Sequence, residues 1–204
     1  MRWWGEHVVP RLVDRMLQNA EVDELRARVC AGLHGRVLEV GFGSGLNLAH
    51  YPAAVTSASA VEPSDVAWRA ASARLDASPV DVRRAGLDGQ RLTLADGSHD
   101  SALSTFTLCT IPDVQAALAE IRRVLRPGGR LAFLEHGLSP EPDVARWQHR
   151  LDPWQGRVFA GCHLDRPIAA LVAGAGFRVG ELSTFYATRP RAWGYAYLGW
   201  AETG

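Results

Sequence analysis

The sequence has no long hydrophobic run and few cysteines, and each scarcity excludes a class of protein. No apolar stretch approaches the ~20 residues of a membrane-spanning helix, so we expect no transmembrane anchor. Three widely spaced cysteines argue against a disulfide framework and fit a reducing cytoplasm. The 22 basic and 22 acidic side chains balance, so no overall positive field would attract nucleic acid. The N-terminus also lacks the pattern of a secretory signal. We therefore expect a cytoplasmic globular protein.

The apolar residues that are present suffice for one domain. Of the 204 residues, 47% are hydrophobic, which favours a single domain over residues 1–204. Short β-branched runs alternate with helical segments. This alternation predicts an α/β fold, a Rossmann-like seven-stranded and mostly parallel sheet with helices on both faces. The expected strands are 36–40, 55–61, 80–83, 101–108, 130–135, 178–184 and 193–198, and the helices are 45–50, 64–75, 113–125 and 165–175. Outside this pattern, residues 1–34 are expected to form an N-terminal helical lid, and residues 137–163 a substrate-side loop insertion.

A glycine-rich stretch, "RVLEVGFGSGLN", follows the first predicted strand. Its acid is Glu39, and its glycines are Gly41, Gly43 and Gly45. In an open α/β sheet, ligands bind where this strand turns into its helix, and glycine lets a ligand approach the main chain. The dinucleotide fingerprint G-x-G-x-x-G would need glycine where Leu46 stands. The spacing E-x-G-x-G-x-G favours S-adenosylmethionine instead, with a purely structural tight turn as the alternative.

Further motifs follow in the order of class I methyltransferases. Glu62 ends the second predicted strand, where a carboxylate can accept hydrogen bonds from two ribose hydroxyls. "LDGQRLTLADGSHDSALSTFTL" resembles the third and fourth motifs of that family, and "AALAEIRRVLRPGGRLAFLEHG" its next helix, turn and strand. The resemblance implies that Asp88 binds the adenine amino group. The expected cofactor residues are Glu39, Gly41, Gly43, Gly45, Asn47, Glu62, Pro63, Asp88, Gly89, Thr107 and Leu108.

Five segments point to one branch of this family. "TLCTIPD", "LRPGGRLAFLEH", "WQHRLDP", "FAGCHLDR" and "GYAYLGW" are similar, in order, to the thiol methyltransferases labelled methyltransferase-like 7. This resemblance implies a small, fairly apolar acceptor and favours a thiol. Relatives of that branch methylate phospholipids or quinones, so an N-, O- or C-methyltransferase for an amphiphile is the alternative. A catalytically silent cofactor-binding scaffold or sensor is a third. Phe42 replaces a cysteine common in that branch. Because the sequence begins "MRWWGEHVVPRLVDRML", we expect no apolar N-terminal anchor like that of the membrane-bound members.

His136 is the candidate catalytic residue. It follows the fifth predicted strand, where its imidazole could take a proton from the acceptor, with a bracing role as the alternative. His149 and His163 are weaker candidates. The spacing of these three histidines is not compact, so the sequence predicts no metal site. Cys109 is expected to be a packing residue, with a nucleophile as the alternative, and Cys162 a structural one, with a reactive thiol as the alternative.

Aromatic and histidine side chains are expected to line the acceptor pocket, with ordinary core packing as the alternative for each tryptophan. The expected substrate residues are Trp3, Trp4, His7, Trp147 and His163. Weak peripheral contact with a membrane is a further alternative, because Trp3 and Trp4 precede an amphipathic helix. That helix is short of lysine, which disfavours such contact. We expect the protein to be a monomer or homodimer with a small-molecule acceptor.

Overall fold

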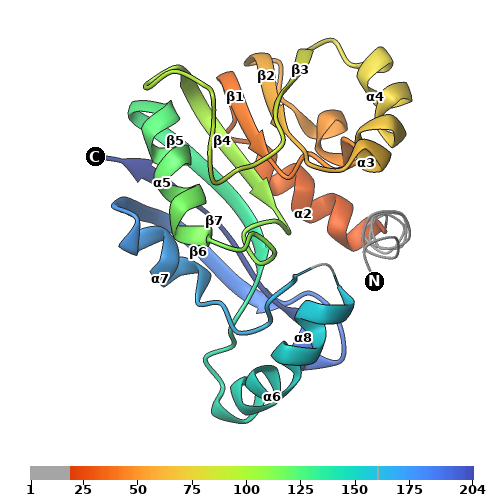
Figure 1. The fold of residues 1–204 in the computed structure, drawn as a ribbon, viewed down its shortest axis with the longest axis vertical. Coiled ribbons are helices and arrows are strands. Elements are labelled where there is room, and N and C mark those ends of the chain that lie inside the picture. The colour runs from red at the N-terminus through yellow and green to blue at the C-terminus, as the bar shows by residue number, and fades with distance from the viewer. Residues whose placement is uncertain (1–18, 160) are drawn as a thin grey trace.

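The computed structural model describes residues 19–159 and 161–204. Its centre is a seven-stranded sheet with the strand order β3-β2-β1-β4-β5-β7-β6 (Figure 1). The pairs among the first five strands are parallel, and β7 runs antiparallel to both β5 and β6. This topology confirms the predicted Rossmann-like sheet.

The elements follow the predicted alternation closely. The strands are β1 (Gly35–Val40), β2 (Val55–Val61), β3 (Asp81–Gly86), β4 (His99–Thr105), β5 (Leu125–His136), β6 (Phe177–Tyr186) and β7 (Tyr195–Thr203). The helices are α2 (Ala20–Cys30), the 3-10 helix η2 (Leu46–His50), α3 (Asp65–Ala70), α4 (Ser72–Ala77), α5 (Val114–Val124), α6 (Pro142–Val158), α7 (Ile168–Gly174) and α8 (Arg191–Gly194). The predicted helix over 64–75 is two short helices, and strand β4 ends earlier than predicted.

Successive side chains of the central strands point to opposite faces of the sheet, and both faces are covered. Val37 packs in a cluster with Leu25 and Val29 of α2. Its neighbour Leu38 packs in the opposite cluster with Leu118 of α5. Figure 1 shows α5 and α7 side by side over this second face. The buried side chains of α5 recur at the spacing of an amphipathic helix, which is why the sequence predicted this helix correctly. They are Val114, Ala117, Leu118, Ile121 and Val124.

The predicted lid is described only in part. Trp3, Trp4, His7 and the amphipathic stretch before residue 18 lie outside the described residues. Helix α2, which belongs to the predicted lid, is a layer of the core, because Leu25, Val29 and Cys30 are buried against the sheet.

The prediction of a loop over 137–163 is wrong, because α6 occupies most of it. Pro142 stands at the start of the helix, where its missing N–H is not needed. The helix is anchored by a buried glutamine instead of a broad apolar stripe. Gln148 donates to the carbonyls of Gly137 and Ala192 at 3.0 and 3.2 Å and accepts from the backbone N–H of Ser139 at 2.8 Å. Hydrophobic periodicity does not register such an anchor, and Pro153 inside the helix favoured a loop.

Parallel pairing brings four strand ends to one edge of the sheet. Val40 at the end of β1 is opposite Val61 of β2 and Ser104 of β4. Thr105, which ends β4, is opposite Leu134 of β5. The segments that follow β1, β2 and β4, together with the last residue of β5, therefore meet at this carboxyl edge, where ligands of open α/β sheets bind. None of the helices in the described ranges is long and apolar enough to cross a membrane.

Candidate active site

The glycine loop after β1 has a packed side and an open side. Gly41, Gly43 and Gly45 all have positive φ angles, of 79°, 59° and 77°. A Cβ added to Gly41 would lie 1.8 Å from Thr107 Oγ1, so this glycine packs against the turn after β4. A Cβ added to Gly43 would meet nothing within 4 Å. The loop therefore leaves its main chain open at Gly43, where a ligand can approach.

Glu62 lies beside this open main chain. Its Oε2 accepts the backbone N–H of Gly43 and its Oε1 that of Ser64, both at 2.7 Å. Burial raises the pKa of the Glu62 carboxyl, and the two backbone N–H groups oppose that rise. Each carboxylate oxygen can accept a further bond, so Glu62 can fix the loop and still receive ligand hydroxyls. Pro63 follows it and is exposed. An open glycine beside an acid fits the ribose and methionine portions of S-adenosylmethionine.

Two other expected cofactor residues bond to each other beneath the loop. Asn47 Nδ2 donates to Glu39 Oε1 at 2.7 Å, and the Tyr51 hydroxyl donates to Glu39 Oε2. Asn47 Oδ1 in turn accepts from Arg26 at 2.7 Å. Burial is the main cause that raises the pKa of Glu39 to about 7. Neither Arg26 nor Tyr51 was predicted to belong to the site. In a sequence, a helical arginine such as Arg26 resembles a solvent-exposed one. This buried network supports the loop from below.

The turn at Asp88 and Gly89 also lies at the carboxyl edge of the sheet. A Cβ on Gly89 would come 2.9 Å from Val40 Cγ1, so this turn packs on the end of β1. Asp88 is exposed, and hydrogen bonds from the side chain and backbone N–H of Gln90 lower the pKa of its carboxyl. An ionised, solvent-facing acid at this place can accept a hydrogen bond from an amino group of a ligand.

The turn after β4 is held by a buried acid that the sequence analysis did not single out. Glu135 is fully buried and accepts hydrogen bonds from Ser104 Oγ at 2.7 Å and from the N–H groups of Thr107 and Cys109 at 3.0 and 3.3 Å. Burial raises the pKa of the Glu135 carboxyl, and the hydrogen bonds from these donors oppose that rise. Leu108, between the two N–H donors, is buried. Glu135 thereby fixes the turn that faces Gly41.

His136, Cys109 and Cys162 meet at this edge. The Nδ1 of His136 lies 3.9 Å from Cys162 Sγ, which lies 3.8 Å from Cys109 Sγ. The contact with the Cys109 thiol, followed by that with His136, lowers the pKa of the Cys162 thiol despite its burial. The same contact, added to burial, raises the pKa of Cys109. Both cysteines therefore lie in the candidate site beside His136. Because they are far apart in the sequence, their proximity could not be predicted from it.

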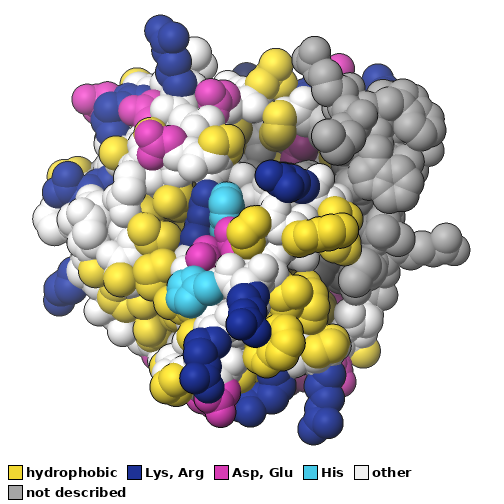
Figure 2. Space-filling model, turned by 60° about the horizontal axis from the view of Figure 1, so that its bottom comes forward, with side chains coloured by type: hydrophobic (Ala, Val, Ile, Leu, Met, Phe, Trp, Pro, Cys, Tyr) yellow, Lys and Arg dark blue, Asp and Glu magenta, His cyan; other side chains and the backbone are white. Residues whose placement is uncertain are grey.

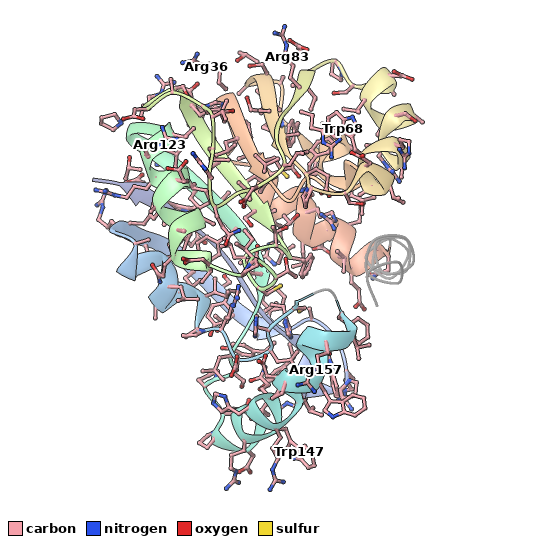
Figure 3. All side chains as sticks on the ribbon, in the orientation of Figure 1. Arg36, Trp68, Arg83, Arg123, Trp147 and Arg157 are labelled. Carbon is pink, nitrogen blue, oxygen red and sulfur yellow. The ribbon has the colours of Figure 1, made fainter. Side chains whose placement is uncertain are left out.

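The two described residues expected to contact the substrate lie apart from each other. The backbone N–H of His163 donates to Cys109 O at 2.8 Å, while its Nδ1 lies 2.9 Å from Asp152 Oδ2. Trp147 is 58% exposed on α6 and lines a surface groove of about 400 Å³ with Trp193 and other residues of α6 and α8. Figure 3 shows Trp147 of α6 at the bottom of the molecule, pointing away from the sheet. No expected cofactor residue lines this groove.

Comparison with known proteins shows similarity to methyltransferases. Residues 38–133 match the family model described as a methyltransferase domain. The solved structure of a geranyl diphosphate methyltransferase in complex with S-adenosylmethionine superimposes with a TM-score of 0.70 at 12% identity, covering 96% of this chain and 90% of that one. The match of residues 38–133 and the shared fold support a methyltransferase domain of the class I, S-adenosylmethionine-dependent type.

Two named relatives narrow the comparison. The human thiol S-methyltransferase TMT1A is 36% identical over 111 residues, which is 50% of this chain and 45% of that protein. The phosphatidylethanolamine N-methyltransferase of Cereibacter sphaeroides is 28% identical over 141 residues, 68% of each chain. The chain thus spans less than half the length of this thiol methyltransferase.

Glu62→Ala is expected to weaken cofactor binding. Loss of a charge-assisted hydrogen bond costs ~1.5–3 kcal/mol, which lowers affinity about ten- to a hundred-fold. Calorimetric titration with S-adenosylhomocysteine measures this effect. Asp65→Ala is the matched control, because Asp65 is a nearby exposed acid paired with Arg84 at 2.6 Å. Equal affinities for Glu62→Ala and the unaltered protein would place the ribose elsewhere.

Proposed function

We propose that the protein transfers the methyl group of S-adenosylmethionine to the thiol sulfur of a small, fairly apolar molecule. One observation carries the proposal. The segments "TLCTIPD", "LRPGGRLAFLEH" and "FAGCHLDR", which resemble thiol methyltransferases, meet at the carboxyl edge of the sheet through Cys109, His136 and Cys162. The first of these segments includes Thr107, which packs on the glycine loop. Donor and acceptor sites are therefore adjacent.

The residues of the site would align the reactants and exclude water, which is most of what methyl transfer requires. When bound, the cofactor supplies a methyl group on a sulfonium. The main chain at Gly43, the Glu62 carboxylate and Asp88 would hold it. Glu135 positions the turn between the donor and acceptor sites. An acceptor thiol with a pKa near ~8.5 needs only modest help to ionise at neutral pH, and His136 is placed to give it.

An amphiphilic acceptor is the second candidate, favoured by an exposed aromatic face. Trp147, Trp154 and Trp193 on α6 and α8 are 58%, 73% and 37% exposed, and the guanidinium of Arg150 lies 5.9 Å from the ring of Trp147. Figure 2 turns this end of the molecule toward the viewer and shows hydrophobic side chains beside arginines. Tryptophan and arginine together suit the boundary between headgroups and acyl chains.

A panel of acceptors separates the candidates. Labelled-methyl transfer from S-adenosylmethionine would be measured with thiols, phenols, quinols and vesicles that contain phosphatidylethanolamine. We expect product from thiols alone. Product from quinols or the amine lipid, without product from thiols, would replace the thiol proposal by the amphiphile. S-Adenosylhomocysteine binding without product from any acceptor would indicate a silent cofactor-binding protein.

A further inference from the structure

Cys109, His136 and Cys162 form a compact donor set. Each offers one ligand atom, and the three atoms lie within 4.8 Å of one another. They come from the turn after β4, the end of β5 and the segment before α7, so the fold assembles them. The sequence predicted no metal site because only the spacing of the histidines was considered. The structure adds two cysteines to His136.

The chemistry of this set is that of a zinc-type ion. Two thiolates and one imidazole suit zinc and not the oxygen-preferring ions. Tetrahedral geometry with Zn–S bonds of about 2.3 Å separates two sulfurs by about 3.8 Å. The two cysteine sulfurs are 3.8 Å apart. A disulfide bond would need them at about 2 Å, so the two thiols are unbonded and their separation matches that of two sulfurs on one tetrahedral ion.

The imidazole faces the sulfurs through one ring nitrogen, because its Nδ1 lies 3.9 Å from Cys162 Sγ. This atom is therefore the ligand that His136 offers to the set. The other ring nitrogen, Nε2, is buried and has no hydrogen-bond partner among the described residues, so no protein group there competes for the ring.

The surrounding structure fixes the cysteines in place. Glu135 accepts the backbone N–H of Cys109, and the N–H of His163 donates to the carbonyl of Cys109, which ties the Cys162 segment to the turn. Asp152 accepts the N–H of Leu164 at 2.6 Å and orders the same segment from α6. Such outer hydrogen bonds orient ligands in metal sites. A second group, formed by Asp152, His163 and Asp165, is half-exposed and already paired internally, so it is not a comparable site.

We propose that Cys109, His136 and Cys162 bind one zinc-type divalent ion and leave its fourth position open to the acceptor thiol. Three protein ligands with an open position are the arrangement of catalytic zinc sites. An acceptor R–SH that enters this position loses its proton to solvent as its S–H bond breaks and a metal–sulfur bond forms, which leaves a bound thiolate. This role for the ion rests on the proposed thiol function. In this arrangement His136 positions the ion and does not take the proton itself.

Metal content tests the site without any methyl transfer. The full chain, prepared without a histidine tag, would be stripped with a chelator, loaded with Zn²⁺ or Co²⁺ and freed of excess metal. We expect about one ion per chain by mass spectrometry, and a thiolate-to-cobalt charge-transfer band in the Co²⁺ form. Cys109→Ser, Cys162→Ser and Cys162→Ala should each lose the band. Cys30→Ala is the matched control, because Cys30 is buried in the α2 layer and should keep it.

Adding a thiol acceptor should shift the visible cobalt spectrum, because the thiolate enters the open position. Several outcomes would overturn the proposal. They are no bound metal in a chain that still binds S-adenosylhomocysteine, metal retained in both cysteine-to-serine variants, and a cobalt spectrum unchanged by every thiol that is methylated. A titration that finds Cys109 and Cys162 joined as a disulfide would also overturn it. The acceptor panel is independent of metal content, so bound metal without thiol methylation would count against the proposed function alone.

Discussion

His136→Ala is expected to lower the turnover rate roughly 10²- to 10⁴-fold while the affinity for S-adenosylhomocysteine stays near normal. His136 ends β5 on the proposed acceptor side, whereas the glycine loop and Glu62 lie on the proposed donor side. If His136 helps to ionise the acceptor, the loss should shrink as the pH rises above the thiol pKa of about 8.5, because solvent then provides the thiolate. Steady-state rates between pH 7 and about 9.5 measure this dependence.

A histidine far from the candidate site provides the control for this variant. His34→Ala removes a histidine at the opposite end of the sheet, next to Ser101, and should leave the rate unchanged. A defect of His136→Ala that is equal at every pH would mean that the side chain only shapes the pocket. Near-normal rates at pH 7 would exclude both ways in which His136 could help ionise the thiol, as proton acceptor or as metal ligand. If the rate falls as expected, metal content separates these two roles, because His136→Ala loses the ion only if His136 is a metal ligand.

Gly41→Ala and Gly43→Ala are both expected to weaken cofactor binding, but only Gly41→Ala should also lose much thermal stability. At Gly41 the new Cβ would lie 1.8 Å from Thr107 Oγ1, so the loop or the turn after β4 must move. We expect this variant to lose thermal stability, and cofactor affinity to fall at least about a hundred-fold, because both sides of the donor site are displaced. At Gly43 the Cβ meets no protein atom within 4 Å, although the positive φ costs about 1 kcal/mol.

Gly43→Ala should therefore keep most of its stability and still lose cofactor affinity, because its methyl group projects where the ligand would approach. Thermal melts with and without S-adenosylhomocysteine, together with calorimetry, measure both quantities. Gly128→Ala is a control for backbone strain alone, because Gly128 also has a positive φ and open space but lies in the turn at the start of β5. Normal cofactor affinity in Gly43→Ala would show that the ligand does not cross this glycine.

Local pattern predicted most of the fold. The strands of the sheet and the amphipathic α5 were predicted because buried strands and one-sided helices repeat with fixed periods. Helix α6 was not predicted. Its anchor is the single buried amide of Gln148, and its exposed face carries Trp147 and Trp154. Periodicity measures apolar burial, so it fails where a helix is held by polar contacts.

For the candidate site, the sequence by itself predicted which residues of the proposed donor side lie together. Gly41, Gly43 and Glu62 follow strand ends, and parallel strands bring their carboxyl ends to one edge, so order along the chain was enough to place them. Only the tertiary structure showed which residues lie together on the proposed acceptor side. Cys109 and Cys162 are 53 positions apart, and Glu135 and Arg26 are buried charges that look solvated in a sequence. Distance in space and the burial of a charge depend on how the chain folds back on itself, and no local spacing carries that information.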